Sequence, residues 1–281
     1  MDTTNINRYR CALRPEKMCP TTRNSAAQLW DALRPVAQQE AAQEPRLAAL
    51  LEQIVLNRAG LEHAILVRLA QRLACNDFSY TDCEGLFLSI LKKRPELVEY
   101  MAADLQAIVD RDPASHTPLP PLLFYKGFHA LCTHRFAHAL WQERRALPAL
   151  LLQSLSSEVF GIDIHPAAQL GCGIMLDHGT GIVIGETAIV ENNVSMLHEV
   201  TLGGTGKEFC DRHPVVRSGV LIGAGAKVLG RVEIGECAKI AASSVVLDDV
   251  RPHTTVAGVP AIEVGTTGLE EPALIMTQAL K

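Results

Sequence analysis

The 281-residue sequence predicts an α+β protein of two parts, an N-terminal all-α domain followed by a parallel β-helix built from hexapeptide repeats. Two observations predict this division. Twelve of the 13 aromatic residues lie at or before Phe160, whereas 17 of the 20 glycines follow it. Beyond that residue, aliphatic side chains recur at every sixth position, a period that neither an α-helix nor an ordinary strand produces. We therefore expect the architecture to change near residue 160.

Composition excludes several classes of protein. Hydrophobic residues make up 48% and charged residues 20% of the chain, as in ordinary globular proteins. The formal net charge of −5 argues against nucleic-acid and anionic-membrane partners. No apolar run approaches the roughly 18 residues that a membrane span needs. The eight cysteines have no paired spacing, so we expect reduced thiols and a cytoplasmic protein.

The first 25 residues differ from the rest of the first half. They carry five basic side chains against two acidic ones, with several Ser, Thr and Asn residues. We expect a disordered N-terminal extension over 1–25, with an organelle-targeting segment as the alternative.

Helical signals run through the domain predicted over 26–160. Ser25 can cap a helix that starts at Ala26, and Pro35 is a candidate interruption within it. Prolines 118, 120 and 121 indicate a connector. Apolar residues recur at helical spacing over 47–55, 61–73, 86–91, 98–108, 126–142 and 146–156.

Two histidines in the segment 126–142 have a spacing that can hold a metal ion. His134 and His138 are four residues apart, so both lie on one face of a helix. No carboxylate or cysteine completes a ligand set nearby, so we expect helix packing and no metal.

The second half of the sequence has a six-residue repeat. Steps of six from Ile164 to Val200, and again from Ile222 to Val246, meet 12 positions, 11 of which are Ile, Leu or Val. A chain wound as a triangular coil produces this count, because three short strands make a turn of about 18 residues and stack one aliphatic column inside. Glycine suits the corners. So narrow a column excludes aromatic rings, which explains why aromatic residues are so rare in the second half of the sequence.

One segment interrupts the count. Val200 and Ile222 are 22 residues apart, four more than one coil of about 18 residues requires. We therefore expect a polar, glycine-rich loop over 203–218 to leave the coil. Binding residues are commonly found on such loops.

The sequence resembles the serine O-acetyltransferase family over roughly residues 28–262. The strings that carry the resemblance are RDPA (111–114) and YKGFHA (125–130) in the first half, and DIHPAA (163–168), MLDHGTG (175–181), VTLGGTGK (200–207) and DRHP (211–214) in the second. The resemblance implies a left-handed β-helix over 161–262 and homotrimers that commonly pair into hexamers. It also implies acetyl transfer from acetyl-CoA to the hydroxyl of L-serine, the first step of cysteine synthesis, with L-cysteine as feedback inhibitor.

Acetyl transfer to a serine hydroxyl needs a base that works near neutral pH, and histidine suits this role. We assign it to His178, with Asp163 orienting the imidazole from the preceding coil, the pair that the resemblance also implies. The alternative for Asp163 is a corner residue that bonds only its own turn.

Four further residues suit the amino-acid substrate. The guanidinium of Arg212 matches an α-carboxylate, and His213 can donate to the substrate or to a developing oxyanion. Asp112 and Asp177 would face the α-ammonium, as the resemblance implies, although Asp112 equally suits a helix end before Pro113.

The resemblance places acetyl-CoA along the coil between neighbouring subunits. Backbone groups of Gly204, Thr205, Ala224 and Ala242 would line the pantetheine arm, and Lys239 is a candidate for a phosphate contact. No covalent intermediate is required, so we assign no role to Cys210 and expect no metal.

The chain departs from the family's pattern at two places. Ile262 and Glu263 follow GVPA (258–261), where the family usually has arginine, which removes a basic residue near the CoA end. The tail predicted over 263–281 ends in Leu280-Lys281 and lacks the terminal isoleucine that binds O-acetylserine sulfhydrylase in many members. We therefore expect that association to be weak or absent.

Three other functions remain as alternatives. A related enzyme could acetylate homoserine or another hydroxyl acceptor. A zinc-dependent γ-type carbonic anhydrase shares the β-helix and would use His178, His198 and His213. A non-catalytic scaffold is the third, but it would leave the set Asp163, His178, Arg212 and His213 unexplained.

Overall fold

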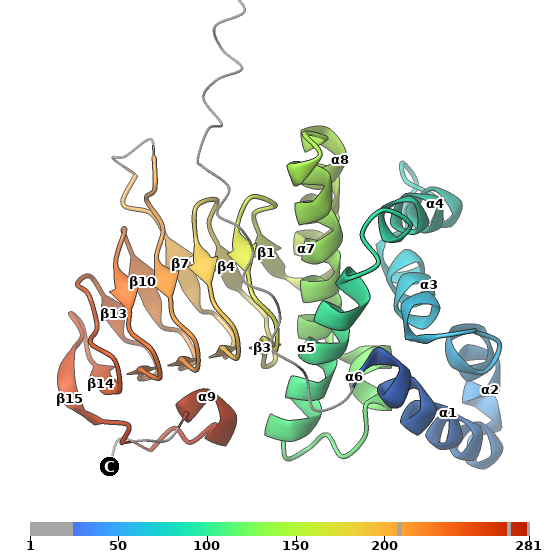
Figure 1. Cartoon of the computed structure of the whole chain (residues 1–281), viewed down its shortest axis with the longest axis horizontal. Coiled ribbons are helices and arrows are strands. Elements are labelled where there is room, and N and C mark those ends of the chain that lie inside the picture. The colour runs from blue at the N-terminus through green and yellow to red at the C-terminus, as the bar shows by residue number, and fades with distance from the viewer. Residues whose placement is uncertain (1–24, 207–209, 269–270, 280–281) are drawn as a thin grey trace, which may run out of the picture.

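A computed structural model describes residues 25–206, 210–268 and 271–279. Within these residues, nine helical segments lead into a three-sided coil of short strands, and the last helix of the first part stands beside the first coil (Figure 1). The helices end at Phe160 and the first strand begins at Ile162. The predicted fold class, a helical region followed by a parallel β-helix, is confirmed. The extension expected over 1–25 lies outside the described residues apart from Ser25.

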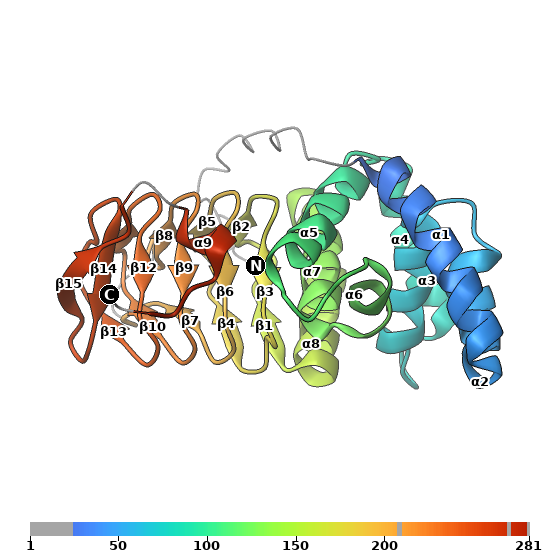
Figure 2. The same ribbon diagram turned by 90° about the horizontal axis from the view of Figure 1, so that it is seen from below.

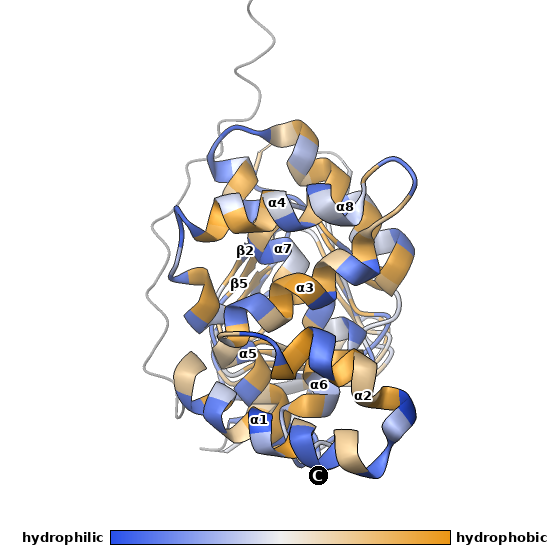
Figure 3. Ribbon diagram, turned by 90° about the vertical axis from the view of Figure 1, so that its right-hand side faces the viewer, coloured by the Kyte–Doolittle hydropathy of each residue, from blue (hydrophilic) through white to orange (hydrophobic). Residues whose placement is uncertain are grey.

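Short helices form a layer on one end of the coil. Figure 3, which views that end, shows apolar and hydrophilic residues alternating along these helices. Buried Leu33, Leu69, Phe87 and Phe136 contribute to the core of this layer. The elements are α1 (Ala26–Gln43), α2 (Pro45–Leu51), the π-helix η2 (Glu52–Leu56), α3 (Leu61–Leu73), α4 (Tyr80–Leu91), α5 (Leu97–Arg111), α6 (Leu119–Phe124), α7 (Lys126–Gln142) and α8 (Ala146–Phe160).

Two proline expectations are wrong. Pro35 lies inside the continuous helix α1 and does not interrupt it. The proline-rich connector is partly helical, because α6 begins at Leu119, and Pro120 and Pro121 occupy its first turn, where the missing amide hydrogen costs nothing.

The strands form the three sides of the coil, each a sheet of parallel strands except for the antiparallel pairing of β15 with β14. The five-stranded sheet has the order β1-β4-β7-β10-β13, the four-stranded sheet β11-β8-β5-β2, and the six-stranded sheet β15-β14-β12-β9-β6-β3. The bounds are β1 (Ile162–Ile164), β2 (Gln169–Leu170), β3 (Met175–Leu176), β4 (Ile182–Ile184), β5 (Ile189–Val190), β6 (Ser195–Met196), β7 (Thr201–Gly203), β8 (Val215–Val216), β9 (Leu221–Ile222), β10 (Lys227–Leu229), β11 (Glu233–Ile234), β12 (Lys239–Ile240), β13 (Val245–Val246), β14 (Thr254–Ala257) and β15 (Ile262–Thr266).

The coils differ in length at two places. Ile162 pairs with Ile182, so the first coil spans 20 residues, and the two extra residues fall between β3 and β4. Val183 pairs with Thr201, which is the expected 18, whereas Thr201 pairs with Lys227, which is 26. The loop between β7 and β8 therefore adds eight residues, and the expected number of four is wrong.

A buried ion pair joins the helices to the first coil. Arg135 of α7 donates to the carboxylate of Asp104 of α5 at 2.5 and 2.8 Å. Each partner also bonds the coil: Arg135 donates to the Gly171 carbonyl, and Asp104 accepts from the Ile174 amide. The coil therefore has a fixed position relative to α5 and α7.

Helix α7 also touches the coil directly at a glycine. A β-carbon on Gly127 would lie 2.1 Å from the carbonyl oxygen of Leu176, so only glycine allows this approach. Leu176 ends β3, and the segment with the two extra residues follows it.

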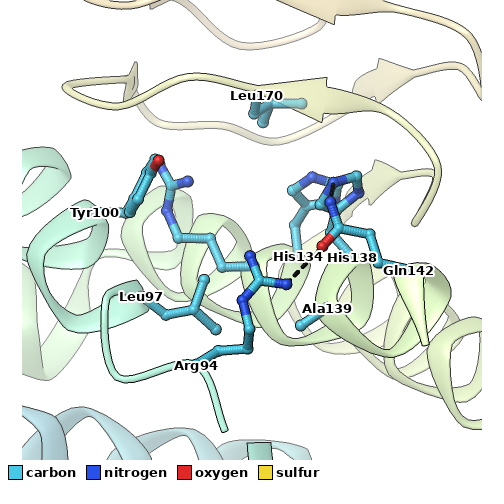
Figure 4. A pocket seen from close by; sticks show the side chains of 9 residues that line it. Arg94, Leu97, Tyr100, His134, His138, Ala139, Gln142 and Leu170 are labelled. Atoms are coloured by element: carbon cyan, nitrogen blue, oxygen red, sulfur yellow. Dashed lines mark hydrogen bonds between the residues drawn. The ribbon is translucent and has the colours of Figure 1, made fainter. Parts of the chain in front are cut away.

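The two helix histidines lie at the same junction. Figure 4 shows His134 and His138 beside Gln142 in a small pocket between α5, α7 and β2. The Nδ1 atom of His138 lies 2.7 Å from the Pro166 carbonyl oxygen, and the two imidazole rings pack against each other. Burial lowers the pKa of His134 well below its usual value. Both residues join the helix to the coil.

The C-terminal residues fold back on the coil. Strand β15 pairs antiparallel with β14, and α9 (Pro272–Ile275) then returns to contact β9 and α5 (Figure 2). The hydroxyl of Ser195 donates to the Ala273 carbonyl, and Arg111 of α5 donates to the same hydroxyl. This segment thus connects the last coil to the helices.

One of the described cysteines differs from the expectation of reduced thiols. Cys172 is disulfide-bonded, so the expectation of eight reduced thiols is wrong. Cys75, Cys83, Cys132, Cys210 and Cys237 are free. Among the described residues, no helix is both long enough and apolar enough to cross a membrane.

Candidate active site

The site residues lie on two edges of the five-stranded sheet. The His178 edge consists of the corner segments 177–181 and 197–200, where the chain passes from the six-stranded to the five-stranded sheet. The Arg212 edge consists of the corner segments 185–188 and 210–214, where the chain passes from the five-stranded to the four-stranded sheet. Asp163 lies on β1, between the two edges.

His178 occupies the two-residue enlargement of the first coil. Its backbone has φ of +56°, and its side chain is 73% exposed. The Nε2 atom lies 3.9 Å from Oδ1 of Asp177, and the ring packs edge-to-face on His198 with centroids 5.7 Å apart. An exposed imidazole beside a carboxylate is accessible to an acceptor from outside the coil.

Asp163 lies beside the turn that carries His178. The Gly181 amide donates to the Gly161 carbonyl at 2.7 Å, which attaches this turn to the start of β1. The carboxylate of Asp163 accepts a hydrogen bond from Gln153 of α8 at 2.7 Å, and it makes none to His178. The turn with His178 and the strand with Asp163 are therefore neighbours in space, but the two side chains are not hydrogen-bonded.

Asp112 and Asp177 come together around a tyrosine. Asp112 caps the C-terminus of α5 and accepts from the Ala114 amide, which is the helix-end role considered as its alternative. Burial, and then the charges of Asp112 and Asp177, raise the pKa of Tyr125. Two carboxylates from different domains thus lie near one phenol, next to His178. This arrangement suits a cationic group.

Arg212 is held by an ion pair on its own edge. Its Nη2 atom lies 2.5 Å from Oε2 of Glu186, in the corner one coil earlier. Both side chains are only about a quarter exposed. Nη1 donates to the Cys210 carbonyl at 3.5 Å, and each Nη carries a second hydrogen that can bond a carboxylate.

His213 is buried and fixed by Thr187. The Thr187 amide donates to Nδ1 of His213 at 3.1 Å, so a neutral ring carries its hydrogen on Nε2. The hydroxyl of Thr187 accepts from the amides of Arg212 and His213. Burial, and then the neighbouring Arg212, lower the pKa of His213. The ring lies across Gly185, where a β-carbon would come within 2.1 Å of Nε2. His213 is thus a neutral donor.

The residues expected to line the cofactor divide between the edges. Ala224 and Ala242 lie in corner segments that continue the His178 edge, joined by the Ser243 amide bonding the Ala224 carbonyl. Gly204 and Thr205 precede the Arg212 edge, with Gly204 close to Arg212 and His213. Lys239 lies on the six-stranded sheet, almost fully buried, and donates to the Ala279 carbonyl.

Several residues of the site were not singled out from the sequence. Tyr125 belongs to a string that carried the family resemblance, but no role was assigned to it. Glu186, Thr187 and Gln153 gave no signal, because their importance depends on neighbours one coil or one helix away.

The histidines expected for a zinc enzyme do not gather. His178 and His198 share one edge, whereas His213 lies on the other. In the parts of the chain that the structure describes, no three His, Cys, Asp or Glu side chains are placed to hold a metal ion.

Comparison with known proteins identifies the family. Residues 29–133 match the family described as "Serine acetyltransferase, N-terminal", and residues 213–248 match "Bacterial transferase hexapeptide (six repeats)". Serine acetyltransferase of Escherichia coli (strain K12) is 46% identical over 250 residues, which is 89% of this chain and 92% of that protein. The chain belongs to the serine acetyltransferase family.

Solved structures of serine acetyltransferases have the same fold. The enzyme of Brucella abortus strain S19 in complex with coenzyme A is 51% identical, with a TM-score of 0.84 over 85% of this chain and 96% of that one. A serine acetyltransferase in complex with cysteine is 45% identical, with a TM-score of 0.88 over 89% of this chain and 98% of that one. This chain is accordingly an acetyl-CoA-dependent O-acetyltransferase.

Proposed function

We propose that the protein transfers the acetyl group of acetyl-CoA to the hydroxyl of L-serine, giving O-acetyl-L-serine and CoA, as the first step of cysteine synthesis. The observation that carries the choice of substrate is the pair Asp112 and Asp177 around Tyr125, beside an exposed histidine. Two carboxylates match an α-ammonium, and Arg212 matches an α-carboxylate. The family membership supports the same substrate.

His178 acts as general base in this proposal. It takes the proton of the serine hydroxyl while that oxygen attacks the thioester carbonyl carbon, and it returns the proton to the departing CoA thiolate. Asp163 orients the imidazole and stabilises its protonated form. Such contacts are often long in a free enzyme and tighten when substrate binds, which is consistent with the unbonded pair.

His213 stabilises the charge that develops on the carbonyl oxygen. A neutral imidazole with its hydrogen on Nε2 is an oriented donor, and burial makes such a donor more effective than it would be in water. Thr187 fixes that tautomer from the opposite side of the ring.

A complete site requires two copies of the chain in this proposal. His178, Asp177 and Asp112 gather at one edge of the five-stranded sheet, whereas Arg212 and His213 belong to the other edge. Neighbouring β-helices in a trimer would bring the His178 edge of one copy against the Arg212 edge of the next. Pairing of two trimers would give a hexamer.

Acetyl-CoA would lie in the same junction. Ala224 and Ala242 of one copy would line it above His178, and Gly204 and Thr205 of the next copy would face them. L-cysteine shares the ammonium and carboxylate of L-serine, so we propose that it occupies the same position and inhibits. The solved structures of relatives with coenzyme A and with cysteine support both assignments.

Release of free thiol from acetyl-CoA, with L-serine, L-homoserine and sugars as parallel acceptors, tests the proposal. We expect L-serine to be the preferred acceptor. Turnover of His178→Ala should be about 10²- to 10⁴-fold lower than that of the wild type. The control is Ser154→Ala, an exposed substitution on α8. A sugar preferred tenfold or more, or near wild-type turnover of His178→Ala, would overturn the proposal.

A further inference from the structure

We propose that Gln153 of α8 is a positioning residue that fixes the carboxylate of Asp163 for its work with His178, so that the helical domain contributes directly to the active site. This inference rests on the catalytic roles proposed above for Asp163 and His178. It adds a residue from outside the β-helix that the chemistry requires.

The contact is short and comes from a different domain. The amide nitrogen of Gln153 donates to Oδ1 of Asp163 at 2.7 Å. The amide presents its nitrogen to the carboxylate oxygen, since the amide oxygen would oppose another acceptor. The direction of the hydrogen bond therefore follows from the chemistry of the two groups.

Local backbone geometry brings the two residues together. Gly161, the residue after α8, has φ of +67°, a left-handed conformation that turns the chain sharply into β1. As a result α8 and β1 lie against each other, and the hydroxyl of Ser156 contacts the Ile162 carbonyl at 3.5 Å. Gln153 thus stands opposite Asp163, although ten residues separate them.

The hydrogen bond restricts rotation of the Asp163 carboxylate, and this restriction matters for catalysis. Rotation of an aspartate carboxylate about its last torsion is broad and roughly two-fold. A donor held on Oδ1 selects one orientation and leaves Oδ2 for a second partner. His178 belongs to the turn that bonds the start of β1 through Gly181, and its imidazole is the partner that the mechanism requires there.

The groove around Asp163 offers its carboxylate few other hydrogen-bond partners. It faces an open groove of about 460 Å³ lined by Leu150, Gln153, Ser154, Ser157 and Glu158 of α8. Glu158 is another carboxylate, and neither serine bonds Asp163. Among the described residues, Gln153 supplies the hydrogen bond that the Asp163 side chain makes within the protein.

The test compares two replacements of Gln153 with a matched control. Gln153→Leu removes the donor at nearly constant volume, and Gln153→Glu keeps the shape but offers no donor. Gln38→Leu makes the same replacement at an exposed position on α1, away from the groove. With L-serine and acetyl-CoA, we expect kcat of both Gln153 variants to fall about tenfold or more. KM for both substrates and the urea midpoint of unfolding should stay as in wild type, and Gln38→Leu should be fully active.

A double-mutant cycle separates positioning from a structural role. If Gln153 acts through Asp163, Gln153→Leu should lower kcat no further once Asp163→Ala is present, because the group it orients is gone. Equal fold losses in the two backgrounds, or full activity of both Gln153 variants, would overturn the inference.

The same measurements identify which proposal has failed. If Asp163→Ala itself turns over like wild type, the proposed mechanism is wrong, whatever Gln153 does. If Asp163→Ala is impaired while the Gln153 variants are not, only the positioning role is wrong.

Discussion

The guanidinium of Arg135 and the carboxylate of Asp104 form an ion pair with closest contact 2.5 Å, in which the two side chains are 5% and 0% exposed. Burial raises the pKa of Asp104, and the charge of Arg135 opposes that effect. Each partner also bonds backbone of the first coil. The pair therefore joins α5, α7 and the β-helix in one contact.

Removing one partner of this pair should be costly. Arg135→Met leaves the carboxylate of Asp104 buried without its counter-charge, so we expect the free energy of unfolding to fall by about 3–5 kcal/mol. Urea unfolding followed by circular dichroism measures it. The control is Lys93→Met, which removes an exposed ion pair with Glu143 and should cost less than about 1 kcal/mol. Equal losses in the two variants would contradict the prediction.

Gly127 should tolerate no side chain. Gly127→Ala places a β-carbon 2.1 Å from the Leu176 carbonyl oxygen, so α7 must move away from the segment that carries Asp177 and His178. We expect lower thermal stability and loss of acetyl transfer. Gly85→Ala on α4 meets no atom within 4 Å and should be neutral, or stabilise by up to about 1 kcal/mol. Unchanged turnover in Gly127→Ala would show that the close approach is not required.

The hydroxyl of Thr187 should matter more than its methyl group. It accepts from the amides of Arg212 and His213, and it lies 2.9 Å from Nδ1 of His213. Thr187→Val keeps the shape and loses these bonds, so we expect kcat/KM for L-serine to fall about tenfold. Thr187→Ser should retain most activity. The idea fails if valine and serine behave alike.

Acid should destabilise the fold partly through His129. Burial lowers the pKa of His129 to about 4, against 6.5 for an ordinary histidine. Between those values the unfolded chain binds a proton that the folded chain does not, so the stabilisation is complete above about pH 6.5 and is lost towards pH 4. The loss is about 3 kcal/mol for this group.

Urea unfolding at several pH values measures this effect. His129→Gln keeps an amide donor near the Leu122 carbonyl but cannot titrate, so its stability should decline less steeply between pH 6.5 and pH 4. Parallel pH profiles for the variant and the wild type would exclude His129 as the source.

The period of six predicted the coil but gave the wrong length for two of its turns, and the reason is physical. Each repeat points two side chains inward, such as Ile162 and Ile164, and then Ile182 and Ile184 one coil later. A two-residue insertion therefore moves the count from one inward row to the other without meeting a polar residue. For this reason the count of six did not reveal the two extra residues at His178. The distance from Val200 to Ile222 was then measured between residues of two different rows, so it gave the wrong length for the loop.

The sequence named candidate site residues one at a time and did not predict how they are arranged. Motif strings pointed to His178, Asp163 and Arg212 because their chemistry is distinctive. That Asp112 lies near Asp177 depends on α5 and α7 reaching the coil, a tertiary contact made through Arg135 and Gly127. Sequence patterns of single elements do not encode such contacts.

The two enlarged coils have a consequence for how the enzyme can change. Stacked repeats on either side of an insertion keep their own pairing, so residues inserted at a corner are largely free of the constraints that hold the column. Away from the contacts described above, the turn with His178 and the loop with Arg212 can accordingly vary in length and chemistry while the stacked strands keep their pairing. New acceptor specificity should therefore be obtained by substitutions in these two segments, at little cost to folding.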